Sequence, residues 1–159
     1  MTAALAGQER PVHVHLASLE LRVAETAAEI EAAQALRYRV FYEELNARPT
    51  PEMSALRRDF DSFDPYCDHL IIIDREKGEG AAGIIATYRL MRRDQAGRRG
   101  QFYSIDEYDI SPLVNYRGGI LELGRSCVDS AYRTKAAMNL MWKGIADYIL
   151  HYKIGVLFG

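Results

Sequence analysis

Residues 120–128, Ile-Leu-Glu-Leu-Gly-Arg-Ser-Cys-Val, combine ionisable side chains with the apolar pattern of a buried strand. Glu122 and Arg125 stand among aliphatic residues, and burying either charge is costly unless the group is paired or used in chemistry. In a regular strand, residues three apart point to opposite faces. A bulge at Gly124 brings both to one face, because glycine inside a strand often marks a bulge. The segment therefore offers a candidate general base, and the alternative is a strand edge with two solvated charges.

A further buried charge is predicted in an N-terminal helix. Thr26 and Glu29 match a capping box, and the apolar pattern that follows predicts a helix to about Leu45. Arg37 falls on the apolar stripe, one turn before Phe41. An arginine there either pairs with a carboxylate or serves an active site, and the pattern leaves both interpretations open.

Residues 46–68 are polar and rich in proline, which predicts a loop with one short helix. The segment contains four aspartates, at Asp59, Asp61, Asp64 and Asp68. A calcium loop of the EF-hand type is excluded because its glycine and its closing glutamate are missing. Solvated loop charge is the simplest interpretation of this run.

Apolar periodicity predicts the remaining elements. Strands are expected at 19–24, 69–74, 82–91 and 154–158, with the middle two forming an antiparallel hairpin. Between 133 and 152 the spacing predicts an amphipathic helix. Its predicted apolar side consists of Met138, Met141, Trp142, Ile145, Tyr148 and Ile149. Such a helix is the crossover that two parallel strands, 120–128 and 154–158, require.

Residues 1–17 are predicted to be a flexible tail. His13 and His15 alternate in it, but two ligands without a third are weak evidence for a metal site.

Composition bounds the classes of function. The length of 159 residues indicates one domain. The formal net charge of −2 argues against a nucleic-acid binder. The two cysteines indicate a reducing compartment and do not make a disulfide scaffold. It contains no apolar run of about 20 residues and no secretion signal, so a cytoplasmic protein is expected.

Several separated motifs occur in a familiar order. They are Arg37-x-x-x-Phe41, Thr87-Tyr88-Arg89, residues 122–128, Tyr132-Arg133 and residues 140–148. From about Leu21 to Gly159 the chain resembles ornithine N-acyltransferases that use acyl carrier protein thioesters. More distantly it is similar to acyl-homoserine-lactone synthases, and both families have the GNAT fold.

The resemblance implies a fold class and a domain organisation. We expect an α/β (α+β) GNAT-like domain at 18–159, with a mixed, mainly antiparallel sheet flanked by helices. Since the families continue with another helix and two further strands, we expect a chain truncated at its C-terminal end.

The resemblance also implies roles for individual residues. Glu122 is expected to be the catalytic base. The acceptor and acyl sides of the cleft are expected to contain Arg37, Phe41, Asp61, Asp64, Arg89, Phe102 and Arg125. A basic run is either a solvated turn or a docking surface for an acidic carrier protein, and it consists of Arg92, Arg93, Arg98 and Arg99.

The implied activity is transfer of a (3-hydroxy)acyl chain from acyl carrier protein to the α-amino group of L-ornithine, giving lyso-ornithine lipid. No metal or organic cofactor is implied, and the donor substrate is the acyl-phosphopantetheine arm of the carrier. Residues 133–138 lack the glycines with which CoA-dependent relatives bind a pyrophosphate, which favours a carrier-bound donor. Peripheral membrane contact is expected only through the lipid product.

Three alternatives to this function remain open at the sequence level. The first is an acyl-homoserine-lactone synthase, and the second is a non-catalytic remnant that binds carrier protein. The third is a thiol hydrolase that uses Cys127 with His69, although a cysteine in a buried strand is more often inert.

Overall fold

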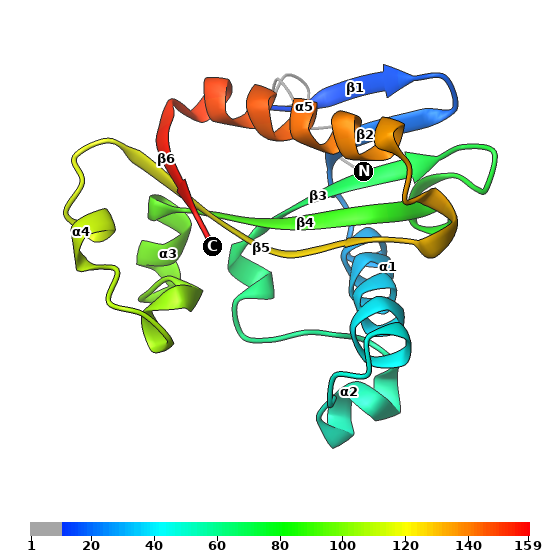
Figure 1. Ribbon diagram of the computed structural model, residues 1–159, viewed down its shortest axis with the longest axis horizontal. Coiled ribbons are helices and arrows are strands. Elements are labelled where there is room, and N and C mark those ends of the chain that lie inside the picture. Colours follow the sequence, from blue (N-terminus) through cyan, green and yellow to red (C-terminus); the bar gives the residue numbers. More distant parts are fainter. Residues whose placement is uncertain (1–10) are drawn as a thin grey trace, which may run out of the picture.

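A computed structural model describes residues 11–159, in which six strands form one sheet in the order of the sequence (Figure 1). The strands are β1 (His13–Leu16), β2 (Leu19–Val23), β3 (Asp68–Asp74), β4 (Ile84–Arg92), β5 (Gly119–Val128) and β6 (Ile154–Phe158). Neighbouring strands are antiparallel from β1 to β5, and β5 and β6 are parallel. The predicted mixed, mainly antiparallel sheet flanked by helices is confirmed.

Strand β1 corrects one boundary at the N-terminal end. The flexible tail was predicted to reach residue 17, but residues 13–16 pair with β2, and His13 lies opposite Arg22. The alternating His-Val-His-Leu pattern is that of an edge strand with one polar face. The rest of the predicted tail, residues 1–10, lies outside the described residues.

Helix α1 (Ala27–Tyr38) covers one face of the sheet, and the capping box that starts it is present between Thr26 and Glu29. The helix continues as a π-helix, η1 (Arg39–Glu44), so the helical segment ends close to the predicted residue 45. Ala33 and Leu36 pack with Ile71 of β3 in a buried apolar cluster. The buried side of α1 therefore faces the sheet, which places Arg37 in the interior.

Helix α5 (Lys135–Tyr152) covers the opposite face and connects β5 to the parallel strand β6 (Figure 1). Leu140 and Ile145 pack with Leu21 and Leu70 in the largest apolar cluster. The prediction that the apolar side of this helix includes Met138 and Trp142 is wrong, because these residues are 50% and 52% exposed. No helix within residues 11–159 combines the length and the hydropathy needed to cross a bilayer.

Short helices lie in the connections between the larger elements. They are α2 (Pro51–Leu56), η2 (Asp64–Tyr66), η3 (Gly80–Gly83), α3 (Arg93–Arg99), η4 (Tyr103–Asp106), α4 (Ser111–Val114) and η5 (Ser130–Tyr132). Of these, α3, η4 and α4 all belong to the connection from β4 to β5. Three residues of the basic run, Arg93, Arg98 and Arg99, therefore lie in helix α3 and not in the predicted turn, while Arg92 is the last residue of β4. Helix α3 ends at Gly100, whose φ of 107° suits glycine.

Candidate active site

Strand β5 contains a bulge. In its pairing with β4, Cys127 lies opposite Thr87 and Gly124 opposite Arg89, so two residues of β5 face the single residue between Thr87 and Arg89. The predicted bulge is present, but its left-handed residue is Arg125, with a φ of 54°, and not Gly124. A non-glycine residue in that region is strained and persists only where its surroundings fix it. Ion pairs of the Arg125 side chain with Asp59 and Asp61 supply that constraint.

Arg37 is fully buried and contacts two aspartates of the segment that follows α2. Its Nη2 donates to Oδ2 of Asp64 at 2.8 Å and to the carbonyl oxygen of Asp59 at 2.6 Å. Its Nε also lies 2.8 Å from Oδ2 of Asp59, as an ion pair without the alignment of a good hydrogen bond. Arg37 therefore has buried carboxylate partners, and its role in an active site stays a prediction.

Arg89, on β4, binds the same segment from the sheet. Its Nη1 donates to Asp61 Oδ1 at 2.7 Å and to Asp64 Oδ1 at 3.1 Å. Burial alone would raise the pKa of Asp64, but the guanidiniums of Arg37 and Arg89 outweigh it and hold this pKa at about 2. Burial also opposes the charge of Asp61, whose pKa Arg89 lowers. Both carboxylates are ionised at neutral pH.

Arg125 completes the network from β5. Its Nη2 donates to Asp61 Oδ2 at 3.3 Å, and its Nε lies 3.7 Å from Oδ2 of Asp59. Tyr42, in η1, donates its hydroxyl to Asp59 at 2.8 Å, and burial together with this carboxylate raises the pKa of Tyr42 to about 12. Three arginines and three aspartates therefore balance one another's charge.

The interpretation of the aspartate run as solvated loop charge is wrong for Asp59 and Asp64. Asp59 has no exposed surface and Asp64 is 4% exposed. Sequence reasoning assigned Asp59 no role in the site and did not single out Tyr42. The available signal was Arg37 on a buried helix face, because such a charge needs at least one buried carboxylate.

Glu122 is buried on β5 and its carboxylate holds a turn in place. Its Oε2 accepts the backbone N–H of Tyr103 at 2.9 Å, and its Oε1 accepts that of Ser104 at 2.7 Å. Each oxygen keeps further lone-pair capacity. The alternative of a solvated charge at residue 122 is wrong, and the carboxylate also anchors η4.

Tyr103 connects Glu122 with the arginine network. Its ring lies 5.5 Å from the guanidinium carbon of Arg89 and 5.4 Å from that of Arg125. The aromatic face therefore stabilises two cations that come from different strands. Sequence reasoning left this segment unassigned, because nothing local marks a tyrosine as a cation partner.

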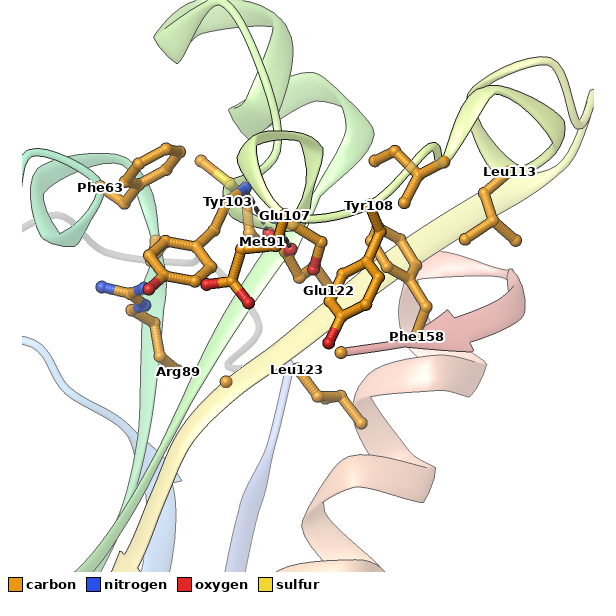
Figure 2. A pocket seen from close by; sticks show the side chains of 15 residues that line it. Phe63, Arg89, Met91, Tyr103, Glu107, Tyr108, Leu113, Glu122, Leu123 and Phe158 are labelled. Atoms are coloured by element: carbon orange, nitrogen blue, oxygen red, sulfur yellow. Dashed lines mark hydrogen bonds between the residues drawn. The ribbon is translucent and has the colours of Figure 1, made fainter.

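A cavity of about 470 Å³ opens beside Glu122. Figure 2 shows Arg89 and Tyr103 at one side of it and Tyr108, Leu113 and Phe158 at the other, with Glu122 between them. Most of the lining is apolar, and the polar groups gather around Glu122. The cavity begins where the pairing of β5 with β6 ends, at Glu122 opposite Phe158. Such a site suits a ligand with an apolar chain and a polar reacting group.

Two predicted site residues, Phe102 and Phe41, do not line the cavity. Phe102 is buried and packs edge to face on Phe158, with ring centroids 5.2 Å apart, so it supports the wall and does not line it. Phe41 packs beside the cluster of α1 and β3, also away from the lining. Arg37, Asp61 and Asp64 adjoin the cavity through Arg89, which does line it.

The four arginines of the predicted docking surface differ in their availability. Arg92 binds Asp68 at 2.5 Å, Arg93 donates to the carbonyl oxygens of Val114 and Tyr116, and Arg99 donates to Ser62 at 2.8 Å. Arg98 is exposed and has no hydrogen bond or ion pair with the described residues. The docking role stays a prediction, for which Arg98 is the most accessible residue.

The two cysteines are poor nucleophiles. Burial raises the pKa of the Cys127 thiol to about 12, and that of Cys67 to about 12 as well. Burial also lowers the pKa of His69, whose Nε2 contacts the carbonyl oxygen of Asp64. Since the thiolate is the reactive form, the thiol-hydrolase alternative has no support in this geometry.

Comparison with protein families adds to this geometry. A family model described as an acetyltransferase (GNAT) domain matches residues 36–143. The matched range contains all three arginines of the network and Glu122.

Curated relatives share one name. A Rhizobium meliloti (strain 1021) protein named L-ornithine N(alpha)-acyltransferase is 46% identical over 98% of this chain and 54% of its own length. A protein of the same name from Brucella abortus (strain 2308) is 45% identical over 91% of this chain and 52% of its own length. The chain thus spans about half the length of these relatives.

Solved structures show a similar fold. The N-acyl amino acid synthase FeeM from uncultured soil microbes matches with a TM-score of 0.61 and 15% identity, over 87% of this chain and 68% of that one. The AHL synthase LasI matches with a TM-score of 0.58 and 14% identity, over 87% of this chain and 70% of that one.

Proposed function

Because this chain belongs to the acetyltransferase (GNAT) domain family, we propose that it transfers an acyl chain from a thioester on acyl carrier protein to the α-amino group of L-ornithine. The observation that carries the proposal is the apolar cavity that meets the buried carboxylate of Glu122 where β5 and β6 stop pairing. The names of the curated relatives support ornithine as the acceptor.

The cavity accounts for the acyl side of the reaction. Its apolar lining includes Met91, Leu113 and Phe158, which shield a hydrocarbon chain from water. The thioester carbonyl then lies near Leu123 and Gly124, beyond the last β5–β6 pair. Backbone amides at the end of this pairing and at the bulge are the donors that would stabilise the oxyanion.

Glu122 is the proposed base. The α-amine attacks the thioester carbonyl as a neutral group, the new C–N bond forms, and the C–S bond breaks to release the carrier thiol. Glu122 accepts the proton from the nitrogen, directly or through a water molecule, and passes it to the departing thiolate, which restores the carboxylate. The amides of Tyr103 and Ser104 fix the carboxylate in one orientation for this transfer.

The arginine–aspartate network is the proposed acceptor wall. Arg89 reaches the cavity while Asp61 and Asp64 compensate its charge. An amino acid carries a positive ammonium group and a negative carboxylate. A wall of paired guanidiniums and carboxylates can therefore bind and orient both groups while its own net charge stays near zero.

A carrier-bound donor is favoured over CoA by the start of α5. Thr134 caps this helix with its own side chain, which accepts the N–H of Ala137 at 3.3 Å. No glycine lies in residues 133–138 to let a pyrophosphate approach the backbone. The basic helix α3 supplies exposed positive charge for an acidic carrier.

The test is an acylation assay with defined donors and acceptors. The chain is incubated with 3-hydroxyacyl carrier protein or the matching acyl-CoA, and with ornithine or S-adenosylmethionine, and products are identified by mass spectrometry. A chimera that joins this chain to the remaining half of the Rhizobium meliloti relative is assayed in parallel. The expected product is N-acylornithine from the carrier donor. Folded proteins that make an acyl-homoserine lactone, or neither product, would reject the proposal.

A further inference from the structure

The hairpin of β1 and β2 brings together three side chains that the acyl-transfer site does not use. His13 and His15 are two residues apart on β1 and therefore point to the same face. In the register of the hairpin, Glu20 lies opposite His15. Strand β1 is at the edge of the sheet opposite β6, and β3 separates the β1–β2 hairpin from β4, the first strand that lines the cavity (Figure 1).

The distances within this group are short. Nε2 of His13 lies 3.0 Å from Oε1 of Glu20, and the two imidazole rings have centroids 4.6 Å apart. Within residues 11–159, this is the only group of three or more histidine, cysteine, aspartate or glutamate residues whose potential ligand atoms all lie within 4.8 Å of one another. Two ligands bound to one zinc ion at about 2.0–2.1 Å in tetrahedral geometry are about 3.4 Å apart. Small side-chain rotations therefore suffice to bring three ligands to one ion.

From this geometry we infer that His13, His15 and Glu20 form a site for a divalent transition metal such as Zn²⁺. Two imidazoles and one carboxylate are ligands of the borderline class that this group of metals prefers. The third ligand, which the histidine pair alone lacks, comes from the neighbouring strand. A bound ion would join β1 to β2 and stabilise the edge strand, independently of the acyl-transfer reaction.

Two arginines border the site and set its affinity. Arg22 lies 3.2 Å from Glu20, but its terminal nitrogens bind Glu29 at 2.5 and 3.1 Å, so a second carboxylate compensates its charge. Arg75 is exposed, contacts Nδ1 of His15 and lies 3.6 Å from Oε2 of Glu20. Arg75 therefore competes with a metal for the same ligands, and its side chain must swing into solvent when an ion binds.

The test measures metal binding by the tag-free chain, with Zn²⁺ titrated calorimetrically and Co²⁺ used for its visible spectrum. We expect one ion per chain and an affinity reduced at least about tenfold in His13→Ala, in His15→Ala and in Glu20→Gln. Arg75→Ala should bind more tightly, because the competing cation is gone. His151→Ala is the matched control, since His151 is an exposed histidine on α5, and it should bind like the unchanged chain.

Hydrogen exchange of the β1 amides gives a second readout that does not depend on activity. Zn²⁺ should slow exchange of these amides in the unchanged chain and leave it unaltered in His13→Ala, with circular dichroism confirming that the variant is folded. The proposal is overturned if Zn²⁺ does not bind, if His13→Ala or His15→Ala binds it as tightly as the unchanged chain, or if His151→Ala loses binding.

Discussion

Arg37 and Asp64, which lie 27 residues apart in the sequence, meet in a buried ion pair with 2.8 Å between Nη2 and Oδ2. The pair fastens the aspartate segment to the buried face of α1. Because both side chains are almost completely buried, loss of the Asp64 charge leaves Asp59 alone to compensate the buried guanidinium of Arg37.

Asp64→Asn should therefore lower the free energy of unfolding by roughly 3–5 kcal/mol, the usual cost of breaking a buried pair from one side. Denaturant titration followed by circular dichroism measures this loss. Asp109→Asn is the control, because Asp109 is exposed and contacts only Ser111 nearby. Equal stability of Asp64→Asn and the unchanged chain would contradict the importance of the pair.

Acid should weaken the fold through the same carboxyl group. The pKa of Asp64 in the folded chain is about 2, below its usual 3.8, because the two arginines outweigh the effect of burial. The stabilisation is complete above about pH 4 and is lost as the pH falls toward 2, for a contribution of about 2 kcal/mol. Unfolding by urea at pH 5, 4, 3 and 2 should reveal this slope. A slope that is just as steep in Asp64→Asn would assign it to other groups.

Glu122→Gln should reduce ornithine acylation by on the order of 10²–10⁴-fold if Glu122 is the base. The assay is the one described for the chimera, with kcat and KM measured separately. Loss of the base lowers kcat. A raised KM with an unchanged kcat would instead indicate that Glu122 acts by holding η4 against the cavity.

Cys127→Ala should retain acyltransferase activity within about twofold. The thiol is buried and its pKa of about 12 leaves almost no thiolate at neutral pH, so it cannot serve as a nucleophile. Labelling with a thiol reagent under native conditions should be slow in the unchanged chain. Rapid labelling accompanied by loss of activity would restore a covalent mechanism.

Arg98→Glu should weaken binding of acyl carrier protein and flatten its dependence on salt, since a rim charge acts mainly on the rate of association. Arg98 is the basic residue of α3 without an intramolecular partner among residues 11–159. Arg48→Glu makes the same change of charge at an exposed position between η1 and α2 and should have little effect. Identical binding by the two variants would place the docking surface elsewhere.

Periodicity and capping predicted the elements that carry the site. The alternation of strands, the capping box at Thr26 and the crossover helix before the last strand are local signals, and all three are confirmed. The buried position of Arg37 also followed from helical spacing. Its partner Asp59 did not, because a run of aspartates in a proline-rich segment looks the same whether it is solvated or enclosed.

The remaining errors come from contacts that local sequence does not encode. Glycine is the usual mark of a bulge, which favoured Gly124, but ion pairs with Asp59 and Asp61 hold Arg125 in the left-handed region. Phe102 was expected at the cavity because of the family resemblance, and the packing of Phe158 separates it from the lining.

The extra residue of the β5 bulge also determines which side chains of this strand face which core. Before the bulge, Leu121 faces the α5 side and Ile120 the side of α1 and α3, whereas after it Val128 faces α5 and Cys127 faces α1. The bulge thus reverses the alternation along the strand. Before the bulge the odd-numbered Leu121 faces α5, and after it the even-numbered Val128 does. A one-codon deletion at 125–126 would remove the extra residue and leave Cys127 and Val128 facing their present cores in a regular strand. What such a deletion would destroy is the left-handed position from which Arg125 reaches Asp59 and Asp61, so the extra residue should persist over evolutionary time only where those ion pairs are needed.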